Sequence, residues 1–116
     1  MKYEQGDIIF VNLDPAKGNE QKKTRPCLVV SNHNYNLVFN TVLVVQISSA
    51  AKYVELEKYR VSPLFAAIDC NGIHGTALLQ HIRAIDPNAR VSGSVVAHLA
   101  DDEMESIVNV MGHFFD

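Results

Sequence analysis

Short apolar runs separated by polar turns form the dominant pattern along this 116-residue chain. Strand-forming residues fill most of the runs, and proline, glycine, asparagine or aspartate stands at their ends, as is typical of strands joined by turns. The strands are expected at residues 8–13, 26–31, 41–48, 63–68 and 76–85, with a further short strand at residues 95–98. Because no helical pattern separates these runs, the sequence excludes a parallel α/β sheet and favours a small β-barrel.

The polar segments between the runs are expected to be turns and loops. Residues 32–40 are rich in asparagine and predict a turn region, residues 49–62 predict a long loop with one helical turn, and residues 88–94 predict a loop. Asn71-Gly72 is the strongest hairpin signal in the chain, because both residues tolerate the positive φ of a two-residue turn.

The C-terminal segment changes from the period of a strand to that of a helix. Four apolar residues at positions i, i+3, i+4 and i+7 form one stripe, namely Met104, Ile107, Val108 and Met111. Asp101 is expected to cap this helix, with further acidic residues in its first turn. The pattern therefore predicts one mostly-β domain over residues 1–116, a small barrel crossed by a C-terminal helix.

Composition supports this size of domain, since 47% of the residues are hydrophobic and 116 residues are enough to bury a core. No apolar run is long enough to span a bilayer, and the N-terminal residues lack the pattern of a signal peptide, so a cytoplasmic location is expected. Cys27 and Cys70 are isolated in sequence, and we expect two free thiols rather than a disulfide or a metal pair.

Charge is distributed unevenly around the formal net value of −3. Residues 1–60 carry eight Lys/Arg against six Asp/Glu, whereas residues 61–116 carry two against seven. The cations concentrate between two expected strands, where only Glu20 opposes Lys17, Lys22, Lys23 and Arg25. A small cationic patch on an acidic body fits one local phosphate site better than a long nucleic-acid track, although most such runs are simply solvated loops.

The second and third expected strands determine where this patch could meet other polar groups. If they form an antiparallel hairpin in which Ser31 pairs with Val42, the same register carries Arg25 opposite Ser48. The two side chains should then share one edge of the sheet.

Three motifs give the chain a resemblance to a known family. The first runs through Gly6, Asp7, Leu13, Asp14, Pro15, Gly18, Glu20, Gln21, Arg25 and Pro26, the second is the hydroxyl of Ser48, and the third is LLQHIRAID at residues 78–86. Together they resemble the MazF/PemK family of toxin endoribonucleases. The sequence departs from the family at Ser48, where many members carry threonine, at His81, where glutamine is usual, and at Asn19, where serine or histidine is common.

The resemblance implies a homodimer of SH3-like barrels that is neutralised by a cognate antitoxin protein in its RNA groove. It implies metal-independent cleavage of single-stranded RNA, messenger RNA above all, by attack of the ribose 2′-hydroxyl, giving 2′,3′-cyclic phosphate and 5′-hydroxyl ends. It also implies that Arg25 and Ser48 are the catalytic pair.

The two residue types suit this reaction. The guanidinium of Arg25 matches phosphate oxygens and can stabilise the charge of the transition state, while the hydroxyl of Ser48 can donate to a non-bridging oxygen. Glu20 and His81 are the supporting candidates. Glu20 is expected mainly to hold Arg25, and His81 is considered because histidine titrates nearest neutral pH. Gln80 and His81 interrupt an apolar run, so at least one of them should face away from the core.

Further polar residues are expected to bind RNA. Lys17, Lys22, Lys23 and Lys52 should hold backbone phosphates, and Asn19, Gln21, Ser49 and Gln80 can read base edges. Tyr35, Tyr53 and Tyr59 can stack on bases, but covering the core is the commoner role of loop tyrosines. No cofactor or metal is expected, because His33, His74, His81, His98 and His113 show no paired ligand spacing.

Two other classes of protein remain open at this point. A toxin resembling CcdB on the same barrel would bind DNA gyrase without cutting nucleic acid, and Arg25 and Ser48 at one edge argue against it. A plain single-strand-binding barrel is disfavoured by the acidic body and by the small number of aromatic residues.

Overall fold

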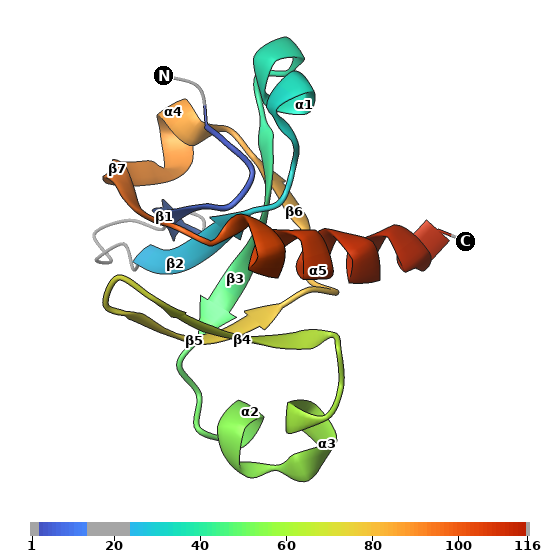
Figure 1. The fold of residues 1–116 in the computed structure, drawn as a ribbon. Helices are drawn as coiled ribbons and strands as arrows, with labels where there is room; N and C mark the ends of the chain where they lie inside the picture. Colours follow the sequence, from blue (N-terminus) through green and yellow to red (C-terminus); the bar gives the residue numbers. More distant parts are fainter. Residues whose placement is uncertain (1–2, 14–23, 116) are drawn as a thin grey trace.

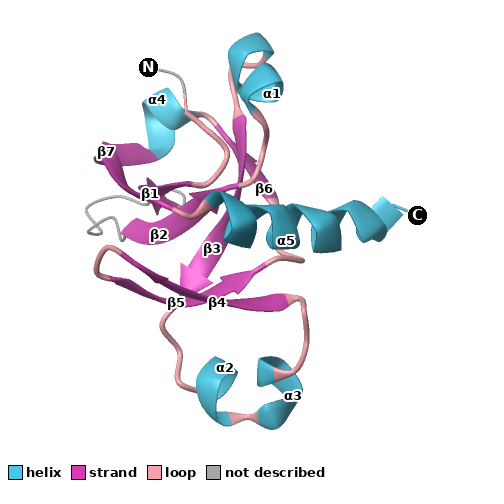
Figure 2. Cartoon of the chain, viewed as in Figure 1, coloured by secondary structure: helices cyan, strands magenta, loops and turns pink. Residues whose placement is uncertain are grey.

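The computed structural model describes residues 3–13 and 24–115. Its strands are β1 (Asp7–Asn12), β2 (Thr24–Val29), β3 (Val42–Ser48), β4 (Phe65–Cys70), β5 (Ile73–Leu78), β6 (Arg83–Ile85) and β7 (Val91–His98). Its helices are α1 (His33–Val38), α2 (Lys52–Glu55), α3 (Glu57–Arg60), α4 (Pro87–Arg90) and α5 (Asp101–Gly112), followed by the short 3-10 helix η1 (His113–Phe115). Strands dominate the drawing, and α5 lies across them (Figures 1 and 2).

The strands form one antiparallel sheet in the order β4-β5-β3-β2-β1-β7, with β6 also paired to β3. Strand β3 is central because β2 runs along one of its edges while β5 and β6 share the other. β6 pairs with the first part of β3 and β5 with its last two residues, so the sheet curls around β3 (Figure 1). The predicted fold class, mostly β with a C-terminal helix, is confirmed.

The predicted register between the second and third strands is also confirmed. Cys27 pairs with Gln46, Leu28 with Val45 and Val29 with Val44, which is the register that sets Arg25 opposite Ser48.

Two apolar clusters fill the space on either side of the sheet. One joins Leu28, Val45 and Leu79 to Met104 and Ile107 of α5. The other gathers residues that alternate with these along the strands, including Ile9, Cys27, Val29, Val44 and Ile85. Side chains at adjacent positions of a strand point to opposite faces, so the same short strands supply both clusters.

Helix α5 buries the predicted stripe only in part. Met104 and Ile107 are buried and Met111 is half-buried, but Val108 lies at the rim and is exposed. The cap prediction was wrong: Ala100 stands at the N-cap without a side-chain hydrogen bond, and Asp101 is the first helical residue. Asp101, Asp102 and Glu103 in the first turn still favour this helix end through its dipole.

The region 32–40 is a helix rather than a turn. The side chain of Asn32 accepts a hydrogen bond from the backbone N–H of Tyr35 at 2.9 Å and so caps α1. Asn36 on this helix is buried, and its amide bonds to the carbonyl of Tyr3. The asparagines that predict a turn act here as a helix cap and as a buried polar anchor.

Residues 76–85 form two strands rather than one, which corrects the expected long strand. Because β5 and β6 pair with different parts of β3, the chain must turn between them, and residues 79–82 make that turn. Leu79 is fully buried within the turn, which explains why the apolar run continues through it. Gln80 and His81 both face outward, as predicted for at least one of them.

The remaining connections are more regular than expected. Residues 49–62 hold two short helices, α2 and α3, instead of one helical turn. In the expected loop at residues 88–94, helix α4 is capped by the side chain of Asp86, and β7 starts at Val91. The predicted hairpin is confirmed, with Asn71 at φ 47° and Gly72 at φ 84° between the paired residues Cys70 and Ile73.

Candidate active site

A pocket of about 300 Å³ lies where β3 ends. Its lining comes from β2, β3, the residues just after β3, and β5, and consists of Arg25, Pro26, Gln46, Ile47, Ser48, Ser49, Ala50 and His74. Both residues of the expected catalytic pair therefore border one pocket, together with Ser49 from the expected RNA-binding set.

Strand direction explains this convergence. β2 and β5 both run antiparallel to β3, so each begins beside the end of β3. Arg25 is the second residue of β2, and Ser48 is the last residue of β3 and pairs with Thr76 of β5. Three neighbouring strands thus bring polar side chains to one edge.

The absence of a side chain at Gly75 permits this close approach. A Cβ built on Gly75 would lie 2.6 Å from the carbonyl oxygen of Ser48 and 2.8 Å from a methyl carbon of Ile47. Only glycine allows β5 to run this near to the end of β3 without a shift of the backbone.

The hydroxyl of Ser48 is oriented by the backbone that follows it. Ala50 N–H donates to Ser48 Oγ at 3.2 Å, so the hydroxyl accepts one hydrogen bond and keeps its own proton for donation. Ser48 is half-buried and Arg25 is exposed at the mouth of the pocket. A cationic fork beside a hydroxyl donor is suited to binding an anionic group such as a phosphodiester.

His74 is a pocket residue that the sequence reasoning considered only as a metal ligand. Its Nδ1 lies 2.9 Å from Oδ1 of Asp69 on the paired strand β4. The Asn71-Gly72 turn fixes the pairing of Asp69 with His74. The position of His74 beside the end of β3 depends instead on the register between β5 and β3, which no local sequence pattern specifies.

The other sequence-predicted residues are distributed around this edge or fall outside the described residues. Gln80 and His81 lie on the turn after β5, apart from the described lining of the pocket. Lys52 begins α2, four residues after Ser48, with its Nζ 5.1 Å from the centre of the Tyr53 ring. Lys17, Asn19, Glu20, Gln21, Lys22 and Lys23 lie outside the described residues, and their expected roles stay predictions.

Tyr53 and Tyr59 pack with Phe65 in an aromatic cluster beneath α2 and α3, with ring centres 4.9 to 5.5 Å apart. Tyr35 packs instead against Phe39, at 4.5 Å. These contacts agree with the structural role that is commoner for loop tyrosines.

Two arginines support the backbone at the end of β1. Arg83 donates to the carbonyl of Leu13 at 3.1 Å, and Arg90 donates to the carbonyl of Asn12 at 3.3 Å. The arginine of the LLQHIRAID motif thus has a structural contact in this chain.

The two cysteines are free, as predicted. Cys27 is fully buried, and this burial raises the pKa of its thiol to about 12, against a smaller opposing effect of the charge of Arg83. A protonated, buried thiol is unreactive, so Cys27 is a core residue.

Over residues 3–13 and 24–115, no three His, Cys, Asp or Glu side chains gather in a way that could hold a metal ion. Within that part of the chain, no helix has the length and apolar character needed to cross a membrane.

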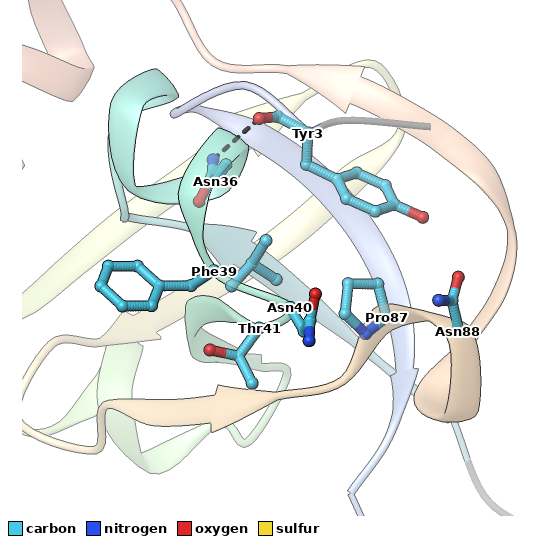
Figure 3. Close-up of a pocket in the computed structure, with 8 residues that line it drawn as sticks. Tyr3, Asn36, Phe39, Asn40, Thr41, Pro87 and Asn88 are labelled. Atoms are coloured by element: carbon cyan, nitrogen blue, oxygen red, sulfur yellow. Dashed lines mark hydrogen bonds between the residues drawn. The ribbon is translucent and has the colours of Figure 1, made fainter.

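A second pocket, of about 180 Å³, lies near the start of β3 (Figure 3). It is lined by Tyr3, Asn36, Phe39, Asn40, Thr41, Val42, Pro87 and Asn88, none of which is charged. Asn36 points to the carbonyl of Tyr3 and binds it at 2.7 Å. This pocket lacks the charge that a phosphodiester requires.

Fold and pocket together define a small curled β-sheet protein with a cationic, hydroxyl-bearing pocket at one sheet edge. Residues 4–115 match the family described as PemK-like, MazF-like toxin of type II toxin-antitoxin system, and the chain belongs to that family.

Two relatives and one solved structure illustrate the match. The chain is 34% identical to the endoribonuclease toxin ChpB of Escherichia coli strain K12 over 104 residues, which cover 89% of this chain and 84% of ChpB. It is 35% identical to the endoribonuclease PemK of Escherichia coli over 89 residues, covering 75% of this chain and 63% of PemK, just under two thirds. The MazE-MazF crystal structure (Form-II) from Deinococcus radiodurans aligns over 99% of this chain and 96% of that chain, with a TM-score of 0.77 at 24% identity, a likeness of fold.

Proposed function

We propose that this chain is an endoribonuclease toxin that cleaves single-stranded RNA, messenger RNA above all, at short sequences and without a metal ion. Support for the activity comes from family membership and from relatives that are named endoribonucleases. The observation that carries the assignment of the site is the shared pocket of Arg25 and Ser48, which the register of β2 and β3 brings to one edge.

In the proposed reaction the ribose 2′-hydroxyl attacks the adjacent phosphorus, and the bond to the 5′-oxygen breaks. The substrate supplies its own nucleophile, so the protein has mainly to orient the phosphate and stabilise the charge that develops on it. Arg25 clamps the non-bridging oxygens, and Ser48 donates its hydroxyl proton to one of them. The products are a 2′,3′-cyclic phosphate and a 5′-hydroxyl.

RNA is proposed to continue from this pocket along the surfaces on both sides. Ser49 borders the pocket and Lys52 follows it on α2, so both can meet nucleotides next to the scissile bond. Gln80 is exposed and free to contact RNA. In this proposal Lys17, Lys22 and Lys23 bind phosphates, Asn19 and Gln21 contact bases, and Glu20 holds Arg25.

The proposed partners are a cognate antitoxin and a second copy of this chain. The family is one of toxin-antitoxin systems, and a structure of similar fold contains a MazE-MazF pair. Sedimentation at working concentration should give about twice the chain mass of 12.9 kDa, and a monomer would contradict the dimer. An RNA target of this kind implies a cytoplasmic site of action.

The test is incubation of the purified protein with a long RNA of mixed sequence in excess chelator, followed by mapping of the new 5′ ends. We expect discrete cuts that carry 5′-hydroxyls and are absent with Arg25→Ala. A folded, antitoxin-free protein that cuts no RNA would overturn the proposal and favour a toxin that binds gyrase without cleavage.

A further inference from the structure

The proposed reaction leaves one role unfilled among the described residues, that of the group that takes the proton from the 2′-hydroxyl. The guanidinium of Arg25 offers N–H donors and no acceptor, and the Ser48 hydroxyl is a weak base. His81, a candidate from the sequence, lies outside the described lining of the pocket. A different imidazole, His74, borders the pocket with Arg25 and Ser48.

We propose that His74, oriented by Asp69, is the general base of RNA cleavage, an inference that rests on the proposed function. Nδ1 of His74 lies 2.9 Å from Oδ1 of Asp69, so an N–H at Nδ1 donates a hydrogen bond to the carboxylate. The neutral imidazole is then held in the tautomer that leaves the lone pair on Nε2. A free Nε2 on a side chain that lines the pocket is the arrangement that a general base needs.

The fold keeps this imidazole at the pocket edge. β4 and β5 pair Asp69 directly with His74 across the hairpin, so the two side chains share one face. Gly75, the next residue, lets β5 approach the backbone of Ser48 closely. The side chain of His74 is 70% exposed, which leaves it accessible to a polymer such as RNA.

Cleavage by this route needs no reagent other than the RNA, the protein and water. Nε2 of His74 takes the 2′-hydroxyl proton as O2′ forms its bond to phosphorus, and Arg25 stabilises the charge on the non-bridging oxygens. The bond from phosphorus to O5′ then breaks, O5′ takes a proton from solvent water, and the imidazolium returns its proton to solvent.

The charged groups around His74 come from different strands. Asp69 on β4 contacts the imidazole, and Arg25 on β2 lines the same pocket. β3 contributes only uncharged side chains to the described lining of the pocket, Gln46, Ile47 and Ser48.

The first test compares His74→Gln with the parent protein on an RNA that the parent cleaves. Because the side chain is exposed, the variant should keep its fold, which circular dichroism verifies. We expect kcat to fall about 100-fold with little change in KM, since a general base contributes on the order of 10² to 10⁴. The parent rate should fall toward acid pH, and the variant should lack this acid limb. Asp69→Asn should cause a smaller loss of kcat.

A matched control is present at the opposite end of β3. His33 on α1 also pairs through Nδ1 with a carboxylate, Glu4 at 3.0 Å, and its side chain is 53% exposed. His33→Gln removes the same kind of histidine–carboxylate contact away from the pocket, so its kcat and pH profile should match those of the parent.

A second substrate shows whether His74 acts as a general base or as a general acid. In an RNA with sulfur in place of the scissile O5′, the thiolate leaves without being protonated. The defect of His74→Gln should persist on this substrate, whereas recovery of the parent rate would show that His74 acts as an acid and overturn the proposal. Full activity of His74→Gln on ordinary RNA, with the parental pH profile, would overturn it too. Failure of the parent protein to cleave RNA is a separate result, which overturns the proposed function itself and the inference with it.

Discussion

The two pockets at opposite ends of β3 differ in how their polar groups are used. Near the start of the strand, the amide of Asn36 bonds to Tyr3 and Ser31, and no lining residue is charged. At the end of the strand, Arg25 and His74 stand at the rim and the Ser48 hydroxyl has a proton to donate. Both sites are concave, and of the two only the pocket at the end of β3 can neutralise a phosphate. The comparison teaches that polar groups committed to the fold stabilise it, whereas polar groups left at a pocket rim can bind a ligand.

The largest expected effect comes from removing the charge of the pocket at the end of β3. Arg25→Ala should lower kcat at least 1000-fold, about 4 kcal/mol of transition-state stabilisation, because a cationic clamp acts on charge formed during the reaction. The change in cleavage rate is measured under single-turnover conditions. Arg25 is exposed, so the melting temperature should stay close to that of the parent. Arg60→Ala, at an exposed arginine of α3, is the control and should keep the parental kcat. Unimpaired cutting by Arg25→Ala would mean that the charge of this pocket is not needed for cleavage, and the contrast between the two pockets would fail.

The hydroxyl of Ser48 in the same pocket should contribute somewhat less to kcat than Arg25 does. Ser48→Ala removes one hydrogen bond to the developing charge, which is worth on the order of 3 kcal/mol, or roughly 100-fold in kcat. The split between kcat and KM decides the role, because a donor that acts in the transition state lowers kcat and leaves RNA affinity nearly unchanged. Ser48→Thr, which restores the residue common in the family, should retain activity. A loss confined to affinity would reduce Ser48 to a positioning contact.

The sequence predicts the arrangement of side chains at the end of β3 better than the arrangement at its start. The register that sets Arg25 opposite Ser48 follows from two apolar runs and one pairing assumption, because a slip by one residue would turn the apolar side chains out of the core. His74 could not be placed in the same way. Its approach to Ser48 depends on the pairing of β5 with β3, strands separated by 24 residues, and no local pattern specifies it.

Local ambiguity accounts for the misassigned elements. Asparagine favours turns and helix caps for the same reason, its side chain bonding to nearby backbone, so residues 32–40 predict a turn where α1 forms. The long strand expected at residues 76–85 has a different cause. Leu79 is buried in the turn between β5 and β6, which keeps the sequence apolar where the ladder breaks.

The pocket at the start of β3 should respond to mutation through stability alone. Asn36→Ala removes the donor to the carbonyls of Tyr3 and Ser31 and the acceptor of the Ser31 hydroxyl proton, in a region where Asn36 itself is 3% exposed. Buried polar groups left unsatisfied cost about 2 to 3 kcal/mol in the free energy of unfolding, or roughly 10 °C in melting temperature. Cleavage by the folded fraction should be unchanged.

The control for this loss is Asn34→Ala, an exposed asparagine on the same helix, which should leave the melting temperature within a degree or two of the parent. A change of kcat in Asn36→Ala at a temperature where it is fully folded would show that the two ends of β3 are coupled, against the comparison drawn above.

The smallest effect concerns the core that separates the two pockets, where Cys27 lies two residues from Arg25. The pKa of its thiol is raised from 9.0 to about 12 by burial, so the folded state keeps the proton that the unfolded state loses above pH 9. The unfolded state then binds fewer protons, and the free energy of unfolding must fall as pH rises through this window, by about 1.4 kcal/mol from this group at pH 10.

Cys27→Ala removes the titrating thiol and leaves every other group in place. The difference in unfolding free energy between parent and variant, measured with urea at pH 8 and pH 10, should therefore move by about 1.4 kcal/mol in favour of the variant. A difference that stays constant between the two pH values would mean that the thiol ionises as easily in the folded chain as in the unfolded one, and that water reaches the core between the pockets.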